Sequence, residues 1–214
     1  MPSAVDRRPY EEASLRAQEF RHSLGIMNDE VVLIYSGGTA HYQMIPQMLM
    51  IWKVLVLQLN VRCVLLTKQS TSHESSIDSL ISSVPGIISL SVDREEIPSY
   101  LVAADIGFLL REQEQLNSVA PPVKFAEYLT AGLAVVTSPG VGDISDLVQN
   151  KNLGILINSH NLKQSVLACS DLIRVIINDR KLFKQKSHHF FQEGYWDLQS
   201  HASIWKKIVK HNVL

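Results

Sequence analysis

Hydrophobic positions in this chain fall into short continuous runs, and longer stretches of helical periodicity separate these runs. Continuous apolar runs rich in β-branched residues are typical of strands buried on both faces. The runs predict six strands, over residues 31–36, 61–67, 86–92, 106–110, 134–137 and 153–157. Because strands and helical segments alternate at the spacing of βαβ units, the sequence predicts an α/β fold in which helices cover both faces of one parallel sheet.

Between these runs, apolar residues recur with the period of an α-helix. The expected helices span 9–24, 42–57, 76–83, 95–103, 122–131, 144–149, 161–178, 180–191 and 198–209. The helix over 42–57 is apolar almost all round, which predicts that it is buried between layers. Asp93 precedes the helix over 95–103, and its side chain is of a type that favours the N-cap position.

The pattern divides the chain into a linker at 1–8, one domain at 9–195 and a closing helix at 196–214. Its 214 residues are 46% apolar and 19% charged, which is enough apolar material for the core of one domain. A net charge of −1 gives no reason to expect nucleic acid or an anionic membrane as a partner. Cys63 and Cys169 lie in apolar or helical patterns without zinc spacing, so we expect reduced thiols in a cytoplasmic protein. The eight histidines show no metal-ligand spacing, and we expect no metal.

The stretch from Arg111 to Val136 carries the most specific pattern in the chain. An apolar run ends at Arg111, a polar loop leads to Pro121 and Pro122, and a helical pattern follows that ends at Gly132. In open parallel sheets, ligands bind outside the carboxyl ends of the strands, where such loops lie. This stretch is therefore the candidate binding site.

Four segments together carry a resemblance to a known family. They are YSGGT at 35–39, DREEIPSYLVAADIGFLLRE at 93–112, NSVAPPVKFAEYLTAGLAVV at 117–136 and GVGDISDLVQNKNLGILI at 140–157. Their order and spacing resemble the carboxyl-terminal, donor-binding lobe of group 1 (family four) retaining glycosyltransferases of the two-lobed GT-B type. The segments at 3–10 and 195–209 are similar to that lobe's first and last segments, so the resemblance covers nearly the whole chain.

The resemblance implies a Rossmann-like, three-layer α/β/α lobe whose parallel sheet has about six strands. It implies binding of a UDP or GDP sugar as donor substrate, without a cofactor or metal, for transfer to an acceptor in glycan or polysaccharide synthesis. It also implies a missing amino-terminal lobe that binds the acceptor, so the isolated chain is expected to be inactive. Any peripheral contact with a membrane would be made through that missing lobe.

Positive charge near the start of the helix at 122–131 suits the diphosphate of such a donor. The free amides of that helix, including those of Val123 and Lys124, face the loop and form an anion site. The Lys124 ammonium adds a mobile charge, and the Arg111 guanidinium adds a planar fork for phosphate oxygens. A solvated surface pair is the alternative for these two cations, and the motif context favours the phosphate role.

Two loops should complete the phosphate site. Gly37 and Gly38, followed by Thr39, form the turn after the first strand and let the backbone approach a phosphate without a Cβ in the way. Asn117 and Ser118 lie in the polar loop and could touch the phosphate or the sugar. Loops are polar in any case, so that assignment stays open.

The ribose and the base should lie next to the phosphates. Glu127 follows Lys124 by three positions, hence on the same helix face, and its two oxygens match the two vicinal hydroxyls of a ribose. The alternative is a plain surface salt bridge with Lys124. The base should contact the chain near the end of the third strand, around Val92 within 91–94, unless Asp93 only caps the next helix.

Departures from the family pattern keep other functions open. Val119 stands where many members carry a glutamate that bears on the transferred sugar, and Pro121 and Ala134 also differ from the usual residues. A non-catalytic nucleotide-binding subunit or sensor that docks to a partner protein is the main alternative. A dinucleotide-dependent oxidoreductase is disfavoured, because SGGTA after the first strand is not G-x-G-x-x-G.

Overall fold

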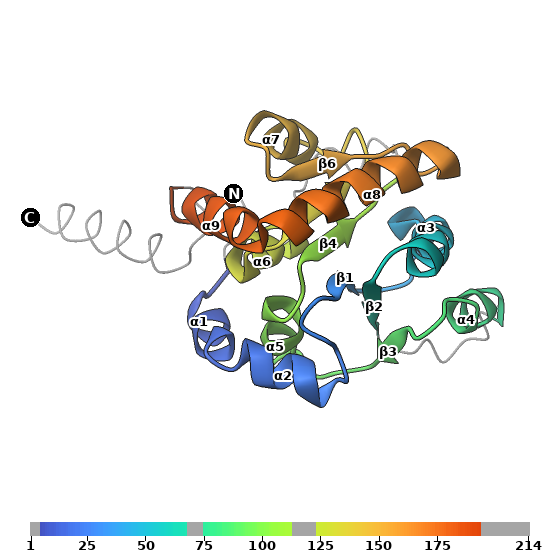
Figure 1. The fold of residues 1–214 in the computed structure, drawn as a ribbon. Helices are drawn as coiled ribbons and strands as arrows, with labels where there is room; N and C mark the ends of the chain where they lie inside the picture. The colour runs from blue at the N-terminus through green and yellow to red at the C-terminus, as the bar shows by residue number, and fades with distance from the viewer. Residues whose placement is uncertain (1–4, 68–74, 113–122, 194–214) are drawn as a thin grey trace, which may run out of the picture.

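Six parallel strands form the central sheet of the computed structural model, which describes residues 5–67, 75–112 and 123–193 (Figure 1). The strand order is β3-β2-β1-β4-β5-β6. The strands are β1 (Val31–Ser36), β2 (Val61–Leu66), β3 (Ile88–Leu90), β4 (Ile106–Leu109), β5 (Ala134–Thr137) and β6 (Gly154–Leu156). The predicted three-layer α/β/α fold with about six parallel strands is thus confirmed.

The two central strands, β1 and β4, lie where the strand order reverses direction. β1 pairs with β2 from Val31↔Val61 to Ser36↔Leu66, and it pairs on its other side with β4 through Leu33↔Ile106. The connections that leave β1 and β4 therefore run in opposite directions across the sheet. In open α/β sheets, ligands bind at the carboxyl ends of such a pair of strands.

Side chains of β1 alternate between two hydrophobic clusters, one on each face of the sheet. Val31, Leu33 and Tyr35 face the first cluster, and Val32 and Ile34 face the second. Because both faces are covered by helices, every residue of this strand is buried. This explains why the strand is a continuous apolar run instead of an alternating one.

Helices cover each face as separate layers (Figure 1). The first cluster takes residues from α3 (Ile45–Gln58), α4 (Ser75–Ser82) and α8 (Leu162–Asn178). The second takes residues from α1 (Arg8–Ser14), α2 (Ala17–Ser23), α5 (Ile97–Val102), α6 (Val123–Ala131) and α7 (Ile144–Asn150). α9 (Arg180–Glu193) reaches both, with Phe183 in the first cluster and Phe191 in the second.

The single helix expected over 9–24 is wrong, because the chain breaks it into α1 and α2 around Leu15, which is 86% exposed. A tertiary contact explains the break. α2 is placed so that Arg21 is buried and donates to the carbonyl oxygens of Ala103 at 2.8 Å and Glu30 at 2.6 Å.

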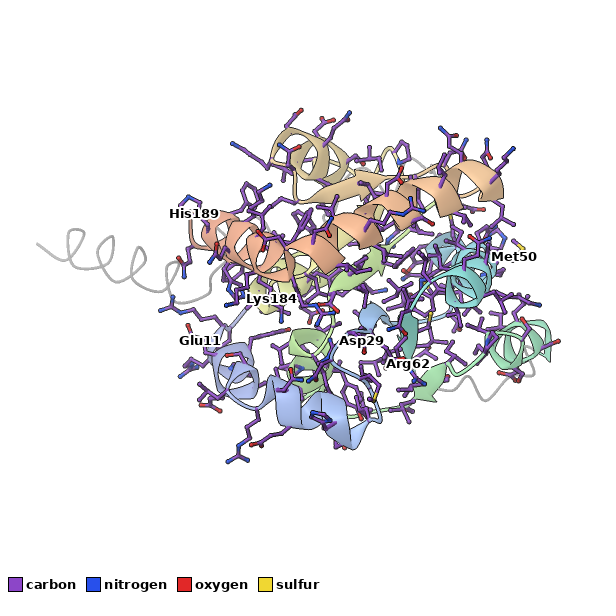
Figure 2. The ribbon with its side chains drawn as sticks, in the orientation of Figure 1. Glu11, Asp29, Met50, Arg62, Lys184 and His189 are labelled. Atoms are coloured by element: carbon purple, nitrogen blue, oxygen red, sulfur yellow. The ribbon has the colours of Figure 1, made fainter. Side chains whose placement is uncertain are left out.

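The helix expected over 42–57 starts later, and its predicted burial on all sides is wrong. A short 3₁₀ turn, η1 (His41–Gln43), comes first, and α3 then starts with Pro46 in its first turn. Proline suits this position because an amide there has no helical partner. α3 packs on one face of the sheet only, so Met50 and Leu57 remain exposed, and Figure 2 shows Met50 on the outer side of the helix.

Two smaller expectations also need correction, one on Asp93 and one on the lengths of two strands. Asp93 does not cap α5 with its side chain; instead its backbone amide donates to the Glu96 carboxylate at 3.1 Å. β3 and β6 are shorter than expected because each is an edge strand that pairs with one neighbour only. The closing helix at 196–214 lies outside the described residues. Within the described ranges, no helix is both long and apolar enough to cross a membrane.

A buried ion cluster closes the amino-terminal edge of the sheet. Asp105 lies directly before β4, and its carboxylate accepts from the Val32 amide at 2.9 Å. The same carboxylate pairs with Arg21 of α2 at 3.3 Å and with Arg180 of α9 at 3.0 Å. Lys184, which Figure 2 shows between α9 and α5, donates to the carbonyl oxygen of Val102 at 3.4 Å. The buried Asp105 carboxylate thus connects α2 and α9 to β1 and β4.

Candidate functional site

The glycine turn after β1 lies at the carboxyl edge of the sheet, where β1 and β4 end. Gly37 has a φ of 150°, which favours glycine, and its amide donates to the Leu66 carbonyl oxygen at 2.9 Å. The Tyr35 hydroxyl donates to the Gly38 carbonyl oxygen at 2.6 Å and so fixes the turn. Gly38 is exposed, and a Cβ there would meet nothing within 4 Å.

Lys124 extends from the first turn of α6 to this glycine turn. Its ammonium donates to the Tyr35 hydroxyl at 2.9 Å and to Gln43 Oε1 at 3.1 Å, and it lies 4.1 Å from the centroid of the Tyr35 ring. A Cβ at Gly37 would overlap the Lys124 ammonium and its Cε. The structure therefore brings the predicted cation and the predicted glycine turn into direct contact.

The pKa of Lys124 is lowered from 10.5 to about 7. Burial is the main cause, the nearby Arg111 guanidinium adds to it, and Glu127 opposes it. An anion at this position would return the missing counter-charge and favour the ammonium form. The site is thus able to take up a proton when a phosphate binds near neutral pH.

Glu127 lies one turn further along α6 and is half-buried. Burial raises the pKa of its carboxyl group, and the positive charges of Arg94 and Lys124 oppose that shift. The Glu127 charge in turn acts on the pKa of Tyr10 from α1, which burial and Glu127 both raise. The structure thus brings Glu127 near the segment after β3, where the sequence places the base.

Arg111 follows β4 and borders a second part of the same edge. Its guanidinium carbon lies 4.8 Å from the centroid of the Tyr42 ring. Its backbone is fixed by Ser138, whose hydroxyl accepts from the Arg111 amide at 2.8 Å and donates to the Arg111 carbonyl oxygen at 2.7 Å. Arg111 also lines a pocket of about 270 Å³, together with Met44, Glu112, Ser138, Pro139, Ile157, Asn158, Ser159 and His160.

Tyr128 fixes α6 against the two central strands. Its hydroxyl accepts from the Ser36 amide at 3.3 Å and donates to the Phe108 carbonyl oxygen at 3.1 Å, so it joins the ends of β1 and β4. Its ring lies against Gly107, where any Cβ would collide with it. Because Tyr128 follows Glu127 directly, these contacts also fix the backbone from which the Glu127 side chain extends.

The remaining predicted residues take less central places. Val123 is the first residue of α6 and is exposed, and Thr39 lies half-buried in the glycine turn. Val92 follows β3 and packs against the second hydrophobic cluster. Asn117 and Ser118 lie outside the described residues.

Two residues of the site were not predicted, namely Tyr35 and Gln43. Tyr35 is the only polar-tipped side chain among the five residues before Ser36 in β1, which was a usable signal in an otherwise aliphatic strand. Gln43 gave no such signal, because its contact with Lys124 joins positions that are 81 residues apart. Among the described residues, no three His, Cys, Asp or Glu side chains gather where they could hold a metal ion.

Comparisons with solved structures place this fold among glycosyltransferases. WaaG, a glycosyltransferase involved in lipopolysaccharide biosynthesis, superposes with a TM-score of 0.71 at 18% identity, over 94% of this chain and 54% of that one. Anabaena HepE in complex with UDP and glucose gives 0.70 at 14% identity, over 97% and 55%. The C-terminal domain of a group 1 glycosyltransferase, LpcC from Francisella tularensis, gives 0.67 at 16% identity, over 91% and 100%.

These coverages define which part of the relatives is matched. The chain spans about half the length of the two longer structures and the whole of the C-terminal domain of LpcC. A scan against protein-family models and a search of curated protein sequences found no match. The fold is that of the carboxyl-terminal lobe of a two-lobed, GT-B glycosyltransferase.

Proposed function

We propose that this chain is the donor-binding half of a retaining glycosyltransferase that takes a UDP or GDP sugar and serves glycan or polysaccharide synthesis. The observation that carries the proposal is the placement of Lys124 against Gly37 at the carboxyl edge of β1 and β4, with Glu127 one turn away. This places a cation, a glycine turn and a carboxylate where nucleotides bind in open α/β sheets.

In this proposal the diphosphate lies over the turn at Gly37 and Gly38. The Lys124 ammonium and the first amides of α6 bind its oxygens, and Arg111 approaches from the end of β4. The ribose hydroxyls donate to Glu127, and the base lies beside Val92 and Arg94. Lys124 and Arg111 supply the positive charge, and no metal or cofactor is assigned.

Sugar transfer requires that negative charge growing on the departing nucleoside diphosphate be stabilised. Lys124 meets this requirement because its surroundings favour the ammonium more strongly as the anion's charge increases. The acceptor and the groups that activate it are assigned to a second lobe, since this chain covers only 54% and 55% of WaaG and HepE. Transfer by the chain alone is accordingly expected to be absent.

Calorimetric titration of the full chain with UDP, GDP and ADP is the primary test. We expect one of the first two to bind at one site per chain, and ADP to bind more weakly. If none of the three binds, the proposed function is wrong. The alternative is a sensor or docking subunit, and Val119 in place of the usual glutamate is compatible with it. Such a protein would bind nucleotide but show no transfer even when the acceptor lobe is supplied.

Gly37→Ala should weaken binding of the nucleoside diphosphate about tenfold or more, because displacing a charged hydrogen-bond donor costs this much. The new Cβ would overlap the Lys124 ammonium and force the side chain out of its position. The φ of 150° at Gly37 adds strain. Calorimetry of the variant checks the affinity, and circular dichroism checks that the fold persists.

Gly38→Ala is the matched comparison for this prediction. A Cβ at Gly38 meets open space, so the free protein should keep its melting temperature. Its diphosphate affinity should fall only if a phosphate approaches Gly38 as proposed. If Gly37→Ala binds like the parent protein, the assignment of the phosphates to this turn is wrong.

Glu127→Gln should weaken binding of UDP or GDP about tenfold, as expected for loss of a charge-assisted hydrogen bond to the ribose. Inorganic pyrophosphate lacks a ribose, so its affinity should change less than about twofold. Equal losses for both ligands would instead show that Glu127 acts on the phosphate site through Lys124.

The nucleotide affinities of the parent protein and of Glu127→Gln should also depend differently on pH. Because the pKa of Glu127 is raised, its carboxylate takes up a proton at a higher pH than an exposed glutamate does. Protonation of Lys124 acts on both proteins alike, so the informative quantity is the affinity of the parent protein divided by that of the Gln variant. This ratio should shrink as the pH is lowered, and the decrease should begin at a higher pH than it would for an exposed glutamate.

A further inference from the structure

We propose that Tyr35 and the η1 turn act as a positioning device for the two site cations, with Tyr35 and Gln43 holding Lys124 and Tyr42 holding Arg111. The inference deepens the proposed function and rests on it. None of these three side chains needs to touch the nucleotide. They act through the cations, and we therefore assign them as positioning residues.

Gln43 and Tyr35 fix the direction of the Lys124 ammonium. Gln43 is buried at 7% exposure, and its Oε1 accepts from the ammonium at 3.1 Å. The Tyr35 hydroxyl accepts from the same ammonium at 2.9 Å. A lysine ammonium has three donors, so these two described contacts leave one hydrogen for an oxygen of the ligand.

Tyr35 also couples the lysine to the glycine turn. Its hydroxyl accepts from Lys124 and donates to the Gly38 carbonyl oxygen at 2.6 Å. Its ring lies 4.1 Å from the ammonium, a distance at which a cation is attracted to the ring face. Tyr35 therefore fixes the position of the Lys124 ammonium relative to the glycine turn.

The η1 turn contacts both Lys124 and the segment after β4 through three consecutive residues. Besides Gln43, His41 pairs with Glu112 at 3.2 Å, and the Tyr42 ring lies 4.8 Å from the Arg111 guanidinium carbon. The Tyr42 carbonyl oxygen also accepts from the Glu112 amide at 3.0 Å. The turn thus joins the segment after β4 to Lys124 at the start of α6.

Met44 holds the turn in place by an unusual backbone conformation. Its φ of 53° and ψ of 38° are left-handed, which is costly for a residue other than glycine. The conformation is kept because the Met44 side chain is buried at 1% exposure, where its sulfur accepts from the Ser159 hydroxyl at 3.2 Å. This kink ends η1 and starts α3, and so directs Gln43 toward Lys124.

The physical benefit of such a device is preorganisation. A free lysine side chain loses rotamer entropy when it binds a ligand, and this loss lowers the affinity. Here the loss occurs on folding, before the ligand arrives. Donors that already point at the place where charge develops need no reorganisation during the reaction.

A double-mutant cycle tests the inference on the full chain. Gln43→Met keeps the length of the side chain but removes the acceptor, and it should weaken UDP or GDP binding about tenfold. Tyr35→Phe should act in the same direction. In a Lys124→Met background, each change should alter affinity by less than about twofold, because residues that act through one partner are not additive.

Two matched controls separate positioning from general damage. Gln58→Met makes the same chemical change at the exposed end of α3, and Tyr100→Phe removes a hydroxyl from a ring that packs against Phe20. Both should bind nucleotide like the parent protein. A tenfold loss from Gln43→Met that persists without Lys124 would overturn the inference.

A measurement without nucleotide separates this inference from the proposed function. Titration of the Lys124 side chain by NMR reports its protonation in the free protein. Gln43→Met should lower the pKa of Lys124 further, because it removes an acceptor that favours the ammonium. An unchanged titration in both Gln43→Met and Tyr35→Phe would overturn the inference, even if the parent protein binds UDP or GDP. If the parent protein binds neither, the proposed function is wrong, and the titration still decides whether these residues position Lys124.

Discussion

Replacing Lys124 by methionine should lower the affinity for a nucleoside diphosphate about 10- to 100-fold, as loss of charged hydrogen bonds predicts. Methionine has a similar length and fills the same space beside Gly37. The change therefore removes the ammonium without opening a large cavity. Calorimetric titration with the nucleotide that the parent protein prefers gives the ratio directly. An exposed lysine of α8, Lys163, is the matched control, since Lys163→Met should leave the affinity unchanged.

The same substitution should raise the stability of the ligand-free protein. The pKa of Lys124 is about 7 in the folded chain against 10.5 for an unperturbed lysine. Between these values the unfolded chain binds a proton that the folded chain lacks. The free energy of unfolding therefore increases as the pH rises through this range. Its destabilising effect is complete below pH 7 and disappears above about pH 10.5.

Thermal unfolding at several pH values checks this sign. The melting temperature of Lys124→Met should exceed that of the parent protein most clearly at pH 6 to 7, and the gap should narrow toward pH 10. Weaker binding combined with higher stability is the pattern of a buried functional group. A variant that is destabilised at pH 7, or that binds nucleotide as tightly as the parent protein, would contradict the role given to Lys124.

Asp105→Ala should cost about 3–5 kcal/mol in the free energy of unfolding, the range measured when one partner of a buried ion pair is removed. The carboxylate is 1% exposed and faces Arg21 and Arg180. Without it, both guanidinium groups remain near the buried edge of the sheet with no counter-charge from this residue, and the Val32 amide loses its acceptor. Urea unfolding followed by circular dichroism measures the loss.

Asp171→Ala provides the contrast for this prediction. Asp171 pairs with Arg174 at 2.7 Å on α8, but both side chains are more than half exposed. Removing such a pair should cost less than about 1 kcal/mol. The Asp105 variant should also keep its nucleotide affinity wherever it stays folded, because Asp105 lies at the amino-terminal edge and Lys124 at the carboxyl-terminal edge. Similar small losses for both variants would contradict the structural role of the ion cluster.

The part of the site that follows from local spacing was readable in the sequence. Lys124 and Glu127 are three positions apart on one helix, and Gly37 directly follows a strand, so the periodicity of the elements predicts the local position of each. Their meeting at one site also requires that β1 and β4 be neighbours in the sheet, which local spacing does not determine. The six strands were also readable, because burial on both faces makes each one a continuous apolar run.

Features that depend on distant contacts were not readable. The contact between Gln43 and Lys124 spans 81 positions, and the ion pair between Arg21 and Asp105 spans 84. The second of these holds α2, one of the two helices that replace the single helix expected at 9–24. The left-handed backbone at Met44 could not be predicted either, because it depends on the burial of the Met44 side chain.

Tyr128 makes the placement of the proposed site depend on the packing of α6. Its hydroxyl binds the ends of β1 and β4, and its ring occupies the space that a side chain at position 107 would fill. Lys124 and Glu127, the residues proposed to bind the nucleotide, thus lie on a helix that Tyr128 fixes to the sheet itself. A substitution at Tyr128 or at Gly107 would therefore shift both proposed contacts together, although neither residue needs to touch the nucleotide.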